Sequence, residues 1–423
     1  MSDSATARAR RTAARRPRGP AVIARHGRLR RPAAWAAVLG WIGGALAVAL
    51  VAGTSVGAIA FWRLTQNISD NAVVIGADSL AAPPSVGEYE GGFNILIIGS
   101  DSDAEGIMND GRDTNLNDVN MLLHVAQDQK SATLVSFPRD LFVPIPECAD
   151  YGPASREKLN VALYYGGDAG GLDCVVQTVQ NLTGLDIQFA GEISFNGVIE
   201  MSNAVGGVDV CLDGGIDDPY TGLFLGPGTH TLQGFEALAF LRSRHGVGDG
   251  SDLSRISSQQ VYLSSLVRKL KSDGTLTDVG KLYALATAAT QNISLSQNFA
   301  RLDTLVSIAL VLKNIPLENI VMVQYPGTTA GGTGGVTALQ GPASALMAAI
   351  QADQPIRLDA DSLDGYGSTL DPNAPAPSSE PSPAGSGSPD PTATDDPGPA
   401  GVVVSGVRGQ SADQYTCSQS FQF

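Results

Sequence analysis

A stretch of 31 residues without a charged side chain, residues 32–62, constrains this chain more than any other feature of its sequence. A helix that crosses the hydrocarbon core of a bilayer needs only about 20 residues. Trp35, Trp41 and Trp62 lie toward the ends of the stretch, as interfacial anchors do. A cleaved signal peptide is the alternative, and residues 58–60 (Ala-Ile-Ala) resemble a cleavage site, but its apolar region is usually about 7–15 residues long. The stretch therefore predicts one uncleaved transmembrane helix.

Charge is distributed unevenly on the two sides of this stretch. Residues 1–31 contain ten of the 27 basic residues and one of the 42 acidic residues, which leaves 17 basic against 41 acidic side chains for the rest of the chain. Basic residues before a span favour a cytoplasmic N-terminus. We therefore expect a cytoplasmic basic tail over 1–31 and an extracellular body anchored in the cell membrane. An acidic body argues against nucleic acid as a partner, because phosphate binding needs clustered basic residues.

Four cysteines, Cys148, Cys174, Cys211 and Cys417, fall in the predicted extracytoplasmic part. An even number in that compartment favours disulfides, and four cysteines permit three pairings. We favour Cys148–Cys174, which closes a modest loop, and Cys211–Cys417 then follows by elimination. No CxxC motif and no cluster of cysteine with histidine is present, so a zinc site is not expected.

The body has the pattern of an α/β domain. Residues 93–100, 119–125 and 132–137 are nearly continuous apolar runs, which suit strands of a sheet that is covered on both faces. Periodicity predicts helices over 155–165, 171–183, 233–241, 255–271, 278–291, 298–313 and 340–352, and further strands over 188–195, 207–212 and 318–325. The fold class is therefore α/β, with a central mixed sheet flanked by helices in α-β-α layers.

The domain boundaries follow from composition. Residues 63–92 have little pattern and are expected to form a stalk, and the α/β domain spans 93–355. Residues 356–400 are expected to be a disordered linker, because proline, serine and glycine dominate their later part and cannot bury a core. Residues 401–423 regain some apolar character and include Cys417, so they are expected to form a C-terminal tail that a disulfide ties to the domain.

The basic residues of the body are clustered. No lysine or arginine occurs in the 83 residues between Lys158 and Arg242, and then Arg242, Arg244 and Arg255 follow within fourteen residues. Arginine carries five donors in a planar fork that suits phosphate oxygens. The alternative is that these arginines only pair with Asp249, Asp252 and Glu236.

A second group of polar residues lies at strand ends. Asp101 follows the strand 93–100, Asp118 precedes the next one, and Arg139 and Asp140 follow the third. Ligands of open α/β sheets bind at strand ends. Carboxylates suit Mg²⁺, which usually takes one or two of them together with phosphates and water. Arginines and paired carboxylates together indicate a metal-assisted pyrophosphate site.

The helices predicted over 255–271, 278–291, 298–313 and 340–352 are rich in Leu, Val and Ala. Such helices can line a pocket for a long hydrocarbon, although ordinary core packing explains the same composition.

Five ordered motifs within residues 93–270 resemble the LytR-CpsA-Psr family, particularly its actinobacterial members. The motifs are Asn94-Ile-Leu-Ile-Ile-Gly-Ser-Asp101, Asn117-Asp118, Ser136-Phe-Pro-Arg-Asp140-Leu-Phe-Val-Pro-Ile-Pro146, Lys158-Leu-Asn160, and Arg242-Ser-Arg-His-Gly followed by Asp252-Leu-Ser-Arg255-Ile-Ser-Ser-Gln-Gln260. The resemblance implies a central sheet with flanking helices that enclose an apolar polyprenyl pocket. It also implies a membrane-anchored phosphotransferase that moves a glycopolymer from a polyprenyl-pyrophosphate carrier to a muramic acid hydroxyl of peptidoglycan.

The resemblance also implies residue roles. Asp101 and Asp118 would hold Mg²⁺ (or Mn²⁺), and the expected catalytic residues are Arg139, Asp101, Asp118 and Arg255. Pyrophosphate binding would fall to Arg139, Arg242, Arg244, Arg255 and Gln259. Supporting positions would be Asp140, which orients Arg139, and Lys158, Asn160 and Asp252.

Three positions depart from the family's usual pattern. Asp103, Leu116 and Ser258 stand where the family often has arginine, and Arg112 is a candidate substitute for one of them. Two alternatives to the transferase therefore stay open: a polyprenyl-pyrophosphate hydrolase, and a non-catalytic lipid-binding regulator of the cell envelope.

Overall fold

The structure is a computed structural model. Apart from isolated positions, it describes residues 72–76, 91–101, 115–272, 287–289, 291–329, 334–359, 361–363, 367–374 and 401–421. The predicted membrane helix, residues 32–62, and most of the predicted stalk lie outside these ranges, as do Asp103 and Arg112. Among the described residues, no helix is both long enough and apolar enough to cross a membrane.

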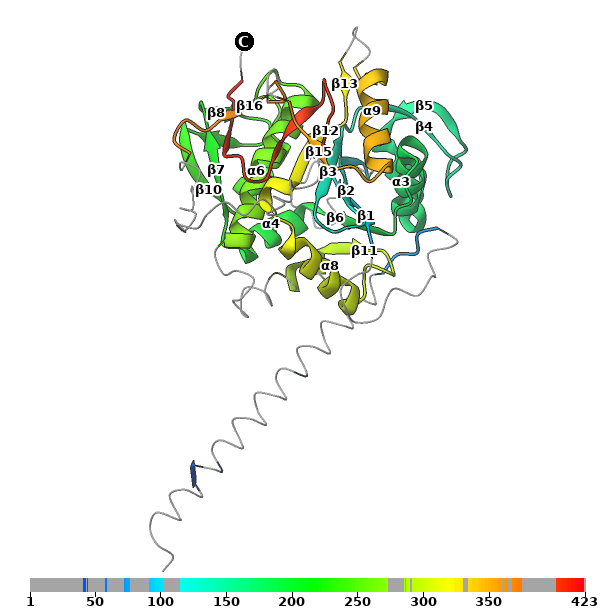
Figure 1. Ribbon diagram of the computed structural model, residues 1–423, viewed down its shortest axis with the longest axis horizontal. Coiled ribbons are helices and arrows are strands. Elements are labelled where there is room, and N and C mark those ends of the chain that lie inside the picture. The colour runs from blue at the N-terminus through cyan, green and yellow to red at the C-terminus, as the bar shows by residue number, and fades with distance from the viewer. Residues whose placement is uncertain are drawn as a thin grey trace, which may run out of the picture. The chain divides into compact units, whose positions relative to one another are not determined.

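A mixed sheet of seven strands forms the centre of the domain, as the sequence predicts (Figure 1). In spatial order its strands are β11 (Ile293–Leu295), β6 (Phe189–Ile193), β1 (Phe93–Ser100), β2 (Asn117–Val125), β3 (Ala132–Phe137), β12 (Ile320–Gln324) and β18 (Arg408–Ser411). Strand β1 pairs antiparallel with β2 and parallel with β6, and β3 pairs parallel with β12. The register sets Ser100 opposite Asn117, so β1 ends where β2 begins.

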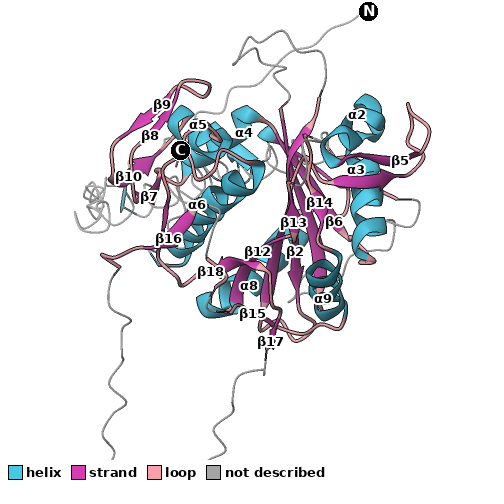
Figure 2. Ribbon diagram, turned by 90° about the horizontal axis from the view of Figure 1, so that it is seen from above, coloured by secondary structure: helices cyan, strands magenta, loops and turns pink. Residues whose placement is uncertain are grey.

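Both faces of this sheet are covered by helices (Figure 2). The covering helices are α2 (Ala162–Tyr165), α3 (Gly167–Thr183), α4 (Phe195–Ala204), α6 (Asp252–Ser272), α8 (Leu302–Asn314) and α9 (Gln340–Gln351). Helix α5 (Phe235–Arg242) instead packs against α4, α6 and β10 (Gly228–Leu232). Alternate side chains of a strand point to opposite faces. Leu96 and Ile98 accordingly pack in one core with α3 and α9, while Phe93 and Ile95 pack in another with α8. Burial on both faces explains the continuous apolar runs of the strands.

A second sheet of four strands lies beside the first. Its order is β10 (Gly228–Leu232), β7 (Val208–Leu212), β19 (Thr416–Ser418) and β16 (Ser368–Leu370). Strand β19 pairs parallel with β7, and the disulfide Cys211–Cys417 joins these two strands. The other disulfide, Cys148–Cys174, connects the segment after β4 (Phe142–Ile145) to α3. Both predicted pairings are confirmed.

The C-terminal segment is more than a tail tied on by a disulfide. It adds β18 to the edge of the central sheet and β19 to the second sheet. The boundary at residue 355 also differs from the expectation, because β15 (Ile356–Arg357) pairs with β17 (Val402–Val403) and β16 pairs with β19. Residues 375–400 of the expected linker lie outside the described ranges. The sequence did not predict this arrangement, because strands that pair with distant segments have no local pattern that identifies their partners.

Residues 155–165 do not form the single helix that their periodicity predicts. They contain β5 (Ala154–Lys158), a 3₁₀ turn (Leu159–Val161) and the short helix α2. Strand β5 pairs antiparallel with β4, and the Arg156 guanidinium lies 3.8 Å from the centroid of the Phe142 ring. Pairing across the hairpin therefore overrides the local helical pattern.

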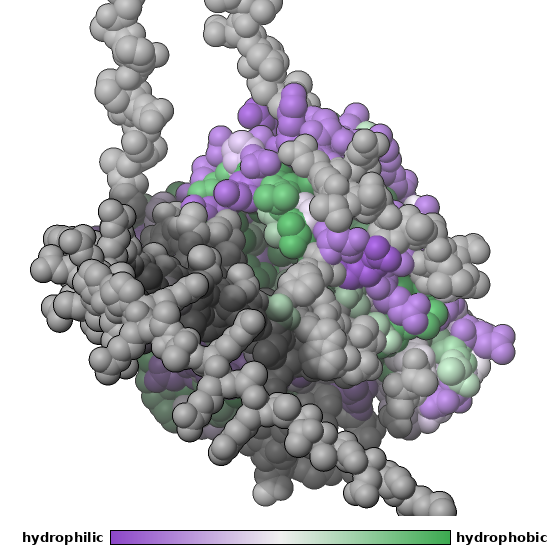
Figure 3. Space-filling view, turned by 90° about the horizontal axis from the view of Figure 1, so that it is seen from below, coloured by the Kyte–Doolittle hydropathy of each residue, from purple (hydrophilic) through white to green (hydrophobic). Residues whose placement is uncertain are grey.

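Hydrophobic surface on the face shown in Figure 3 is divided into small areas bordered by hydrophilic residues. The exposed apolar residues of the described chain include Val306 and Leu310 of α8, which are 49% and 45% exposed. Scattered apolar residues of this kind are ordinary on soluble domains. The apolar surface that bears on function lines a cavity beside the central sheet.

Candidate active site

A cavity of about 500 Å³ lies between the ends of β1 and β2 and the helices α4, α5 and α6. Its polar end holds Asp118 of β2 and four arginines, Arg139, Arg242, Arg244 and Arg255. These residues come from segments that are far apart in the sequence. The fold thus gathers most of the predicted site residues around one opening.

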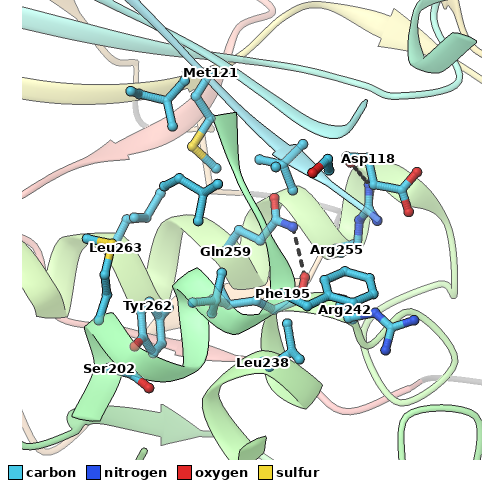
Figure 4. A pocket seen from close by; sticks show the side chains of 18 of the residues that line it. Asp118, Met121, Phe195, Ser202, Leu238, Arg242, Arg255, Gln259, Tyr262 and Leu263 are labelled. Atoms are coloured by element: carbon cyan, nitrogen blue, oxygen red, sulfur yellow. Dashed lines mark hydrogen bonds between the residues drawn. The ribbon is translucent and has the colours of Figure 1, made fainter. Parts of the chain in front are cut away.

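The rest of the cavity wall is mainly hydrophobic. It includes Met121 of β2, Val198, Met201 and Val205 in and after α4, Leu238 and Leu241 of α5, and Tyr262, Leu263, Leu266 and Leu270 of α6. In Figure 4, Asp118 and Arg255 lie at one end, and Met121 and Leu263 lie toward the other. The cavity therefore joins a cationic end to an apolar interior, which suits an amphiphile with an anionic head.

Two of the helices expected to line an apolar pocket do not line this cavity. Helix α8 packs beneath the sheet with Phe93 and Ile95, and α9 packs on the opposite face with Leu96 and Ile98. Their apolar residues are core, as the alternative interpretation of the sequence held. Helix α6 does line the cavity, and Leu285, from the predicted helix 278–291, lines it as well.

Asp252 fixes two of the arginines with one carboxylate. Its Oδ2 accepts a hydrogen bond from the backbone N–H of Arg139 at 3.0 Å, and its Oδ1 lies 2.6 Å from Nη2 of Arg255. The same Nη2 donates to the backbone oxygen of Asp118 at 2.7 Å. Asp252 and Arg255 are 3% and 5% exposed in their side chains. Because both oxygens of Asp252 are engaged, its geometry fits a positioning role better than that of a general base.

Asp140 joins three cations. Its Oδ1 lies 2.9 Å from Nζ of Lys158, and its Oδ2 lies 3.7 Å from Nε of Arg139 and 3.9 Å from Nη1 of Arg244. Asn160 supports the same region through its backbone N–H, which donates to the backbone oxygen of Arg139. Asp140 and Asn160 thus contact Arg139, and Lys158 contacts Asp140, while none of the three lines the cavity itself.

Electrostatics keep Arg139 charged. Burial opposes its charge, but three neighbouring carboxylates outweigh this effect and raise the pKa of Arg139 above its ordinary value. The strongest contribution comes from Asp118, whose Oδ1 accepts a hydrogen bond from Nη1 of Arg139 at 2.5 Å. The guanidinium is therefore held in one orientation at the cavity wall.

The surroundings of Arg244 lower its pKa, in contrast to those of Arg139. Burial lowers its pKa, and repulsion from Arg139 and Arg255 lowers it further. A folded-state pKa below the unfolded value means that the charged form is less favourable in the folded protein, so at neutral pH this charge costs stability. An anion between the three arginines would remove that cost.

Two donors at this end lack acceptors. Nε of Arg139 and Nε of Arg255 are buried and, within the described residues, have no hydrogen-bond partner. A buried donor without an acceptor is costly, at about 1–3 kcal/mol. Guanidinium donors of this kind beside a cavity are available to the oxygens of a phosphate.

Arg242 and Gln259, to which the family resemblance assigns pyrophosphate binding, both line the cavity. The Arg242 guanidinium lies 4.4 Å from the centroid of the Phe195 ring, a cation–π contact. The Gln259 amide donates to the backbone oxygen of Leu241 at 2.8 Å (Figure 4). This bond ties α6 to α5 and fixes the orientation of the Gln259 side chain.

The two carboxylates predicted to hold a metal lie at the same end of neighbouring strands. Asp101 is 5% exposed, and its Oδ1 accepts the backbone N–H of Leu116 at 2.7 Å. Asp118 lines the cavity. Their oxygens are the hard donors that Mg²⁺ prefers. In the described part of the chain, no third acidic, His or Cys side chain joins them in a metal-binding group, so a metal here would need ligands from phosphate and water.

The position of Ser258 explains one departure from the family pattern. Ser258 is fully buried, and its Oγ lies 2.8 Å from Oγ of Ser418 in β19. It does not line the cavity. Ser258 therefore packs against the C-terminal strand β19 and not against the cavity.

Three cavity residues had no role in the sequence interpretation. Asp218, Tyr220 and His245 line the same opening as the arginines. His245 directly follows Arg244 in the motif, which was a usable signal. Asp218 and Tyr220 come from the hairpin of β8 (Ile216–Asp218) and β9 (Leu223–Leu225), and nothing local in the sequence connects that hairpin to the arginines.

Replacement of Arg244 by glutamine is expected to weaken anion binding without destabilising the free protein. Because the charge of Arg244 opposes folding at neutral pH, we expect a thermal midpoint equal to or above that of the wild type, and a several-fold lower affinity for inorganic pyrophosphate. Thermal unfolding with and without pyrophosphate measures both. A midpoint lowered by more than about 3 °C in the free protein would contradict this electrostatic interpretation.

The sequence of this chain is similar to those of known proteins. A family model described as the LytR_cpsA_psr family matches residues 63–354. The chain is similar to the cell wall biosynthesis protein LcpA of Corynebacterium glutamicum, with 33% identity over 273 residues, 58% of this chain and 52% of LcpA. It is also similar to the polyisoprenyl-teichoic acid–peptidoglycan teichoic acid transferase TagT of Bacillus subtilis, with 29% identity over 299 residues, 69% of this chain and 86% of TagT. The match thus spans about half the length of LcpA.

Solved structures share the fold. A LytR-Csp2A-Psr enzyme from Actinomyces oris superposes with a TM-score of 0.50 at 22% identity, over 66% of this chain and 94% of that one. A crystal structure of a Streptococcus agalactiae protein superposes with a TM-score of 0.52 at 22% identity, over 62% and 88%. The family model covers well over half of the sequence and includes every motif around the cavity. The chain belongs to the LytR_cpsA_psr family.

Proposed function

We propose that this protein transfers a glycopolymer from a polyprenyl-pyrophosphate carrier to peptidoglycan during cell-wall assembly. The observation that carries the proposal is the arrangement of the cavity, in which arginines with unpaired donors stand at one end of a hydrophobic interior. A pyrophosphate joined to a long hydrocarbon matches both ends. The similarity to TagT, a polyisoprenyl-teichoic acid–peptidoglycan teichoic acid transferase, supports the same substrate class.

The reaction is a phosphoryl transfer. A muramic acid hydroxyl oxygen forms a bond to the phosphorus that carries the glycan, and the bond from that phosphorus to the bridging oxygen of the pyrophosphate breaks. Polyprenyl phosphate leaves, and the hydroxyl proton is released. Such reactions depend mainly on positioning and on neutralising the phosphate oxygens. Arg139, Arg244 and Arg255 are oriented for this work by Asp140 and Asp252.

Mg²⁺ (or Mn²⁺) is the proposed cofactor, held by Asp101 and Asp118. When bound, it would neutralise charge on the pyrophosphate oxygens. The two carboxylates also act without it, because Asp118 orients Arg139 and Asp101 closes the end of the β1–β2 pair.

The cofactor proposal predicts that EDTA abolishes transfer and that added Mg²⁺ restores it. Asp118→Asn is expected to lower transfer at least tenfold and to raise the Mg²⁺ concentration that gives half-maximal activity. Asp217→Asn, which changes an exposed carboxylate of β8 outside the cavity, serves as the control. Full activity in EDTA would exclude the metal from the reaction.

We also propose a single-pass membrane protein with a cytoplasmic N-terminus and an extracellular catalytic domain. The uncharged stretch 32–62 with arginines before it supports this topology. The two disulfides support an oxidising compartment for the domain. The partners would then be a polyprenyl-linked glycan in the membrane and peptidoglycan outside it.

Acceptor dependence tests the proposed function. The full-length protein in detergent is incubated with a polyprenyl-pyrophosphate glycan, and the release of polyprenyl phosphate is measured with and without peptidoglycan fragments. A transferase is expected to release it only when the fragments are present. Equal release in their absence would indicate the hydrolase instead.

A further inference from the structure

Two aromatic rings at the polar end of the cavity are not used by the chemistry proposed above. Tyr220 and His245 both line the cavity, and their ring centroids are 4.3 Å apart with 33° between the planes. Tyr220 is 76% exposed, and His245 is exposed as well. A large aromatic ring that is held at a cavity opening and left open to solvent is available to a ligand.

The Tyr220 backbone is fixed by the residue that begins its turn. The backbone N–H of Tyr220 donates to Oδ1 of Asp218 at 3.0 Å, and the backbone N–H of Gly222 donates to the backbone oxygen of Asp218 at 2.9 Å. Gly222 has a φ of +71°, a conformation that glycine adopts without strain. The turn between β8 and β9 therefore carries Tyr220 in a defined position.

The same carboxylate ties this turn to the arginines. Oδ2 of Asp218 accepts a hydrogen bond from Oγ of Ser243 at 2.7 Å, and Ser243 lies between Arg242 and Arg244 in the chain. Asp218 and Ser243 are fully buried. Burial opposes ionisation of Asp218, but its hydrogen bonds to Ser243 and to the turn outweigh this and keep its pKa below the ordinary value. The Asp218 carboxylate thus links the turn that carries Tyr220 to the segment between Arg242 and Arg244.

We propose that Tyr220 and His245 bind the sugar ring that is joined directly to the pyrophosphate of the donor. The proposal rests on the proposed function. The axial C–H groups of a pyranose pack on flat aromatic faces, and the phenol and imidazole can bond hydroxyls at the edge. The first sugar is joined to the phosphate through a single oxygen, so it would lie beside the arginine end of the cavity while the hydrocarbon occupies the apolar interior. His245 is the residue after Arg244, which puts the ring pair at that place.

The test compares two lipids that differ only in the sugar. The full-length protein in detergent is titrated with polyprenyl pyrophosphate and with the same lipid carrying one N-acetylhexosamine. Three variants are measured beside the wild type: Tyr220→Ala, Tyr220→Phe and Phe224→Ala. Phe224 is the matched control, because it is a 64% exposed aromatic residue of the same hairpin that does not line the cavity.

Tyr220→Ala is expected to weaken binding of the sugar-bearing lipid about 3- to 10-fold and to leave binding of the sugar-free lipid unchanged. Tyr220→Phe keeps the ring and is expected to stay within about twofold of the wild type, as is Phe224→Ala. Equal losses for both lipids, or no loss for either, would overturn the proposal. Peptidoglycan fragments are titrated in the same way, and a Tyr220→Ala loss confined to them would also overturn the proposal, because the rings would then bind the acceptor.

If the proposed function itself is wrong, the experiment gives a different result from the one expected when only the sugar subsite is wrong. In that case the wild type itself binds neither lipid, and the comparison between variants has no signal. Binding of both lipids by the wild type, with no discrimination by Tyr220→Ala, overturns only the assignment of the sugar subsite.

Discussion

Replacement of Arg139 by alanine is expected to reduce glycan transfer by at least about 100-fold, since loss of one preorganised donor to developing charge commonly has an effect of this size. Arg139 is held by Asp118, by Asp140 and, through its backbone, by Asp252. Its pKa is raised by these carboxylates, so its charge is present throughout the physiological range. The rate of polyprenyl phosphate release in the presence of peptidoglycan fragments measures the loss.

Two controls separate this effect from a loss of structure. Arg139→Lys keeps the charge but loses the planar fork, so it is expected to retain only a small part of the activity. Lys158→Ala removes a cation that pairs with Asp140 outside the cavity, and it is expected to lower activity less than tenfold. Near-normal transfer by a folded Arg139→Ala protein would show that the arginine end of the cavity is not where the chemistry occurs.

Removal of the C-terminal segment is expected to prevent cooperative folding. A chain that ends at residue 374 loses β18 from the edge of the central sheet and β19 from the second sheet. It also loses the Cys211–Cys417 bond and the Arg268 contacts with the backbone oxygens of Ala412 and Gln414. Because domains are stable by only about 5–15 kcal/mol, loss of these contacts exceeds what the rest can support. Thermal unfolding by circular dichroism tests this expectation.

A double cysteine variant separates the contribution of the disulfide to stability from that of the strands. Cys211→Ser combined with Cys417→Ser keeps the segment and opens a link between residues 206 positions apart. A cross-link over so long a loop is worth about 3–5 kcal/mol, so we expect a midpoint lowered by roughly 5–15 °C in a protein that still folds. A truncated chain that unfolds cooperatively within about 3 °C of the full-length protein would contradict the structural role of the segment.

The C-terminal segment also supports the loop that carries Arg244. The backbone N–H of Gly248 donates to the backbone oxygen of Gln419, and that of Phe421 donates to the backbone oxygen of Gly246. Oγ of Ser418 also lies 2.8 Å from Oγ of Ser258 in α6. The disulfide variant should therefore lose more affinity for pyrophosphate than its stability alone would explain.

The sequence was most informative where local patterns and strand ends coincide. The apolar runs of β1, β2 and β3 predicted a sheet covered on both faces, and Arg139 and Asp118 were expected at its edge because they flank these runs. The arginine-poor stretch before Arg242 made the cluster of Arg242, Arg244 and Arg255 visible. All of these features depend on residues that are close together in the chain.

The remaining features depend on contacts between distant segments. Pairing of β18 with β12 and of β19 with β7 leaves no periodic signal in residues 401–423, which were expected to be only a tail. The turn that carries Tyr220 reaches the arginines through Asp218 and Ser243, 25 residues apart in sequence. Apolar helices gave no sign of whether they would line a cavity or fill the core, because both environments select the same side chains.

The most direct test of the proposed function is the identity of the product. The full-length protein is incubated with Mg²⁺, a polyprenyl-pyrophosphate glycan and peptidoglycan fragments, and the muropeptides are analysed by mass spectrometry. Transfer predicts a muropeptide whose mass has increased by the glycan and one phosphodiester, and this product should be absent with Arg139→Ala. Free glycan phosphate with unmodified muropeptides, or no turnover of a lipid that stays bound, would contradict it.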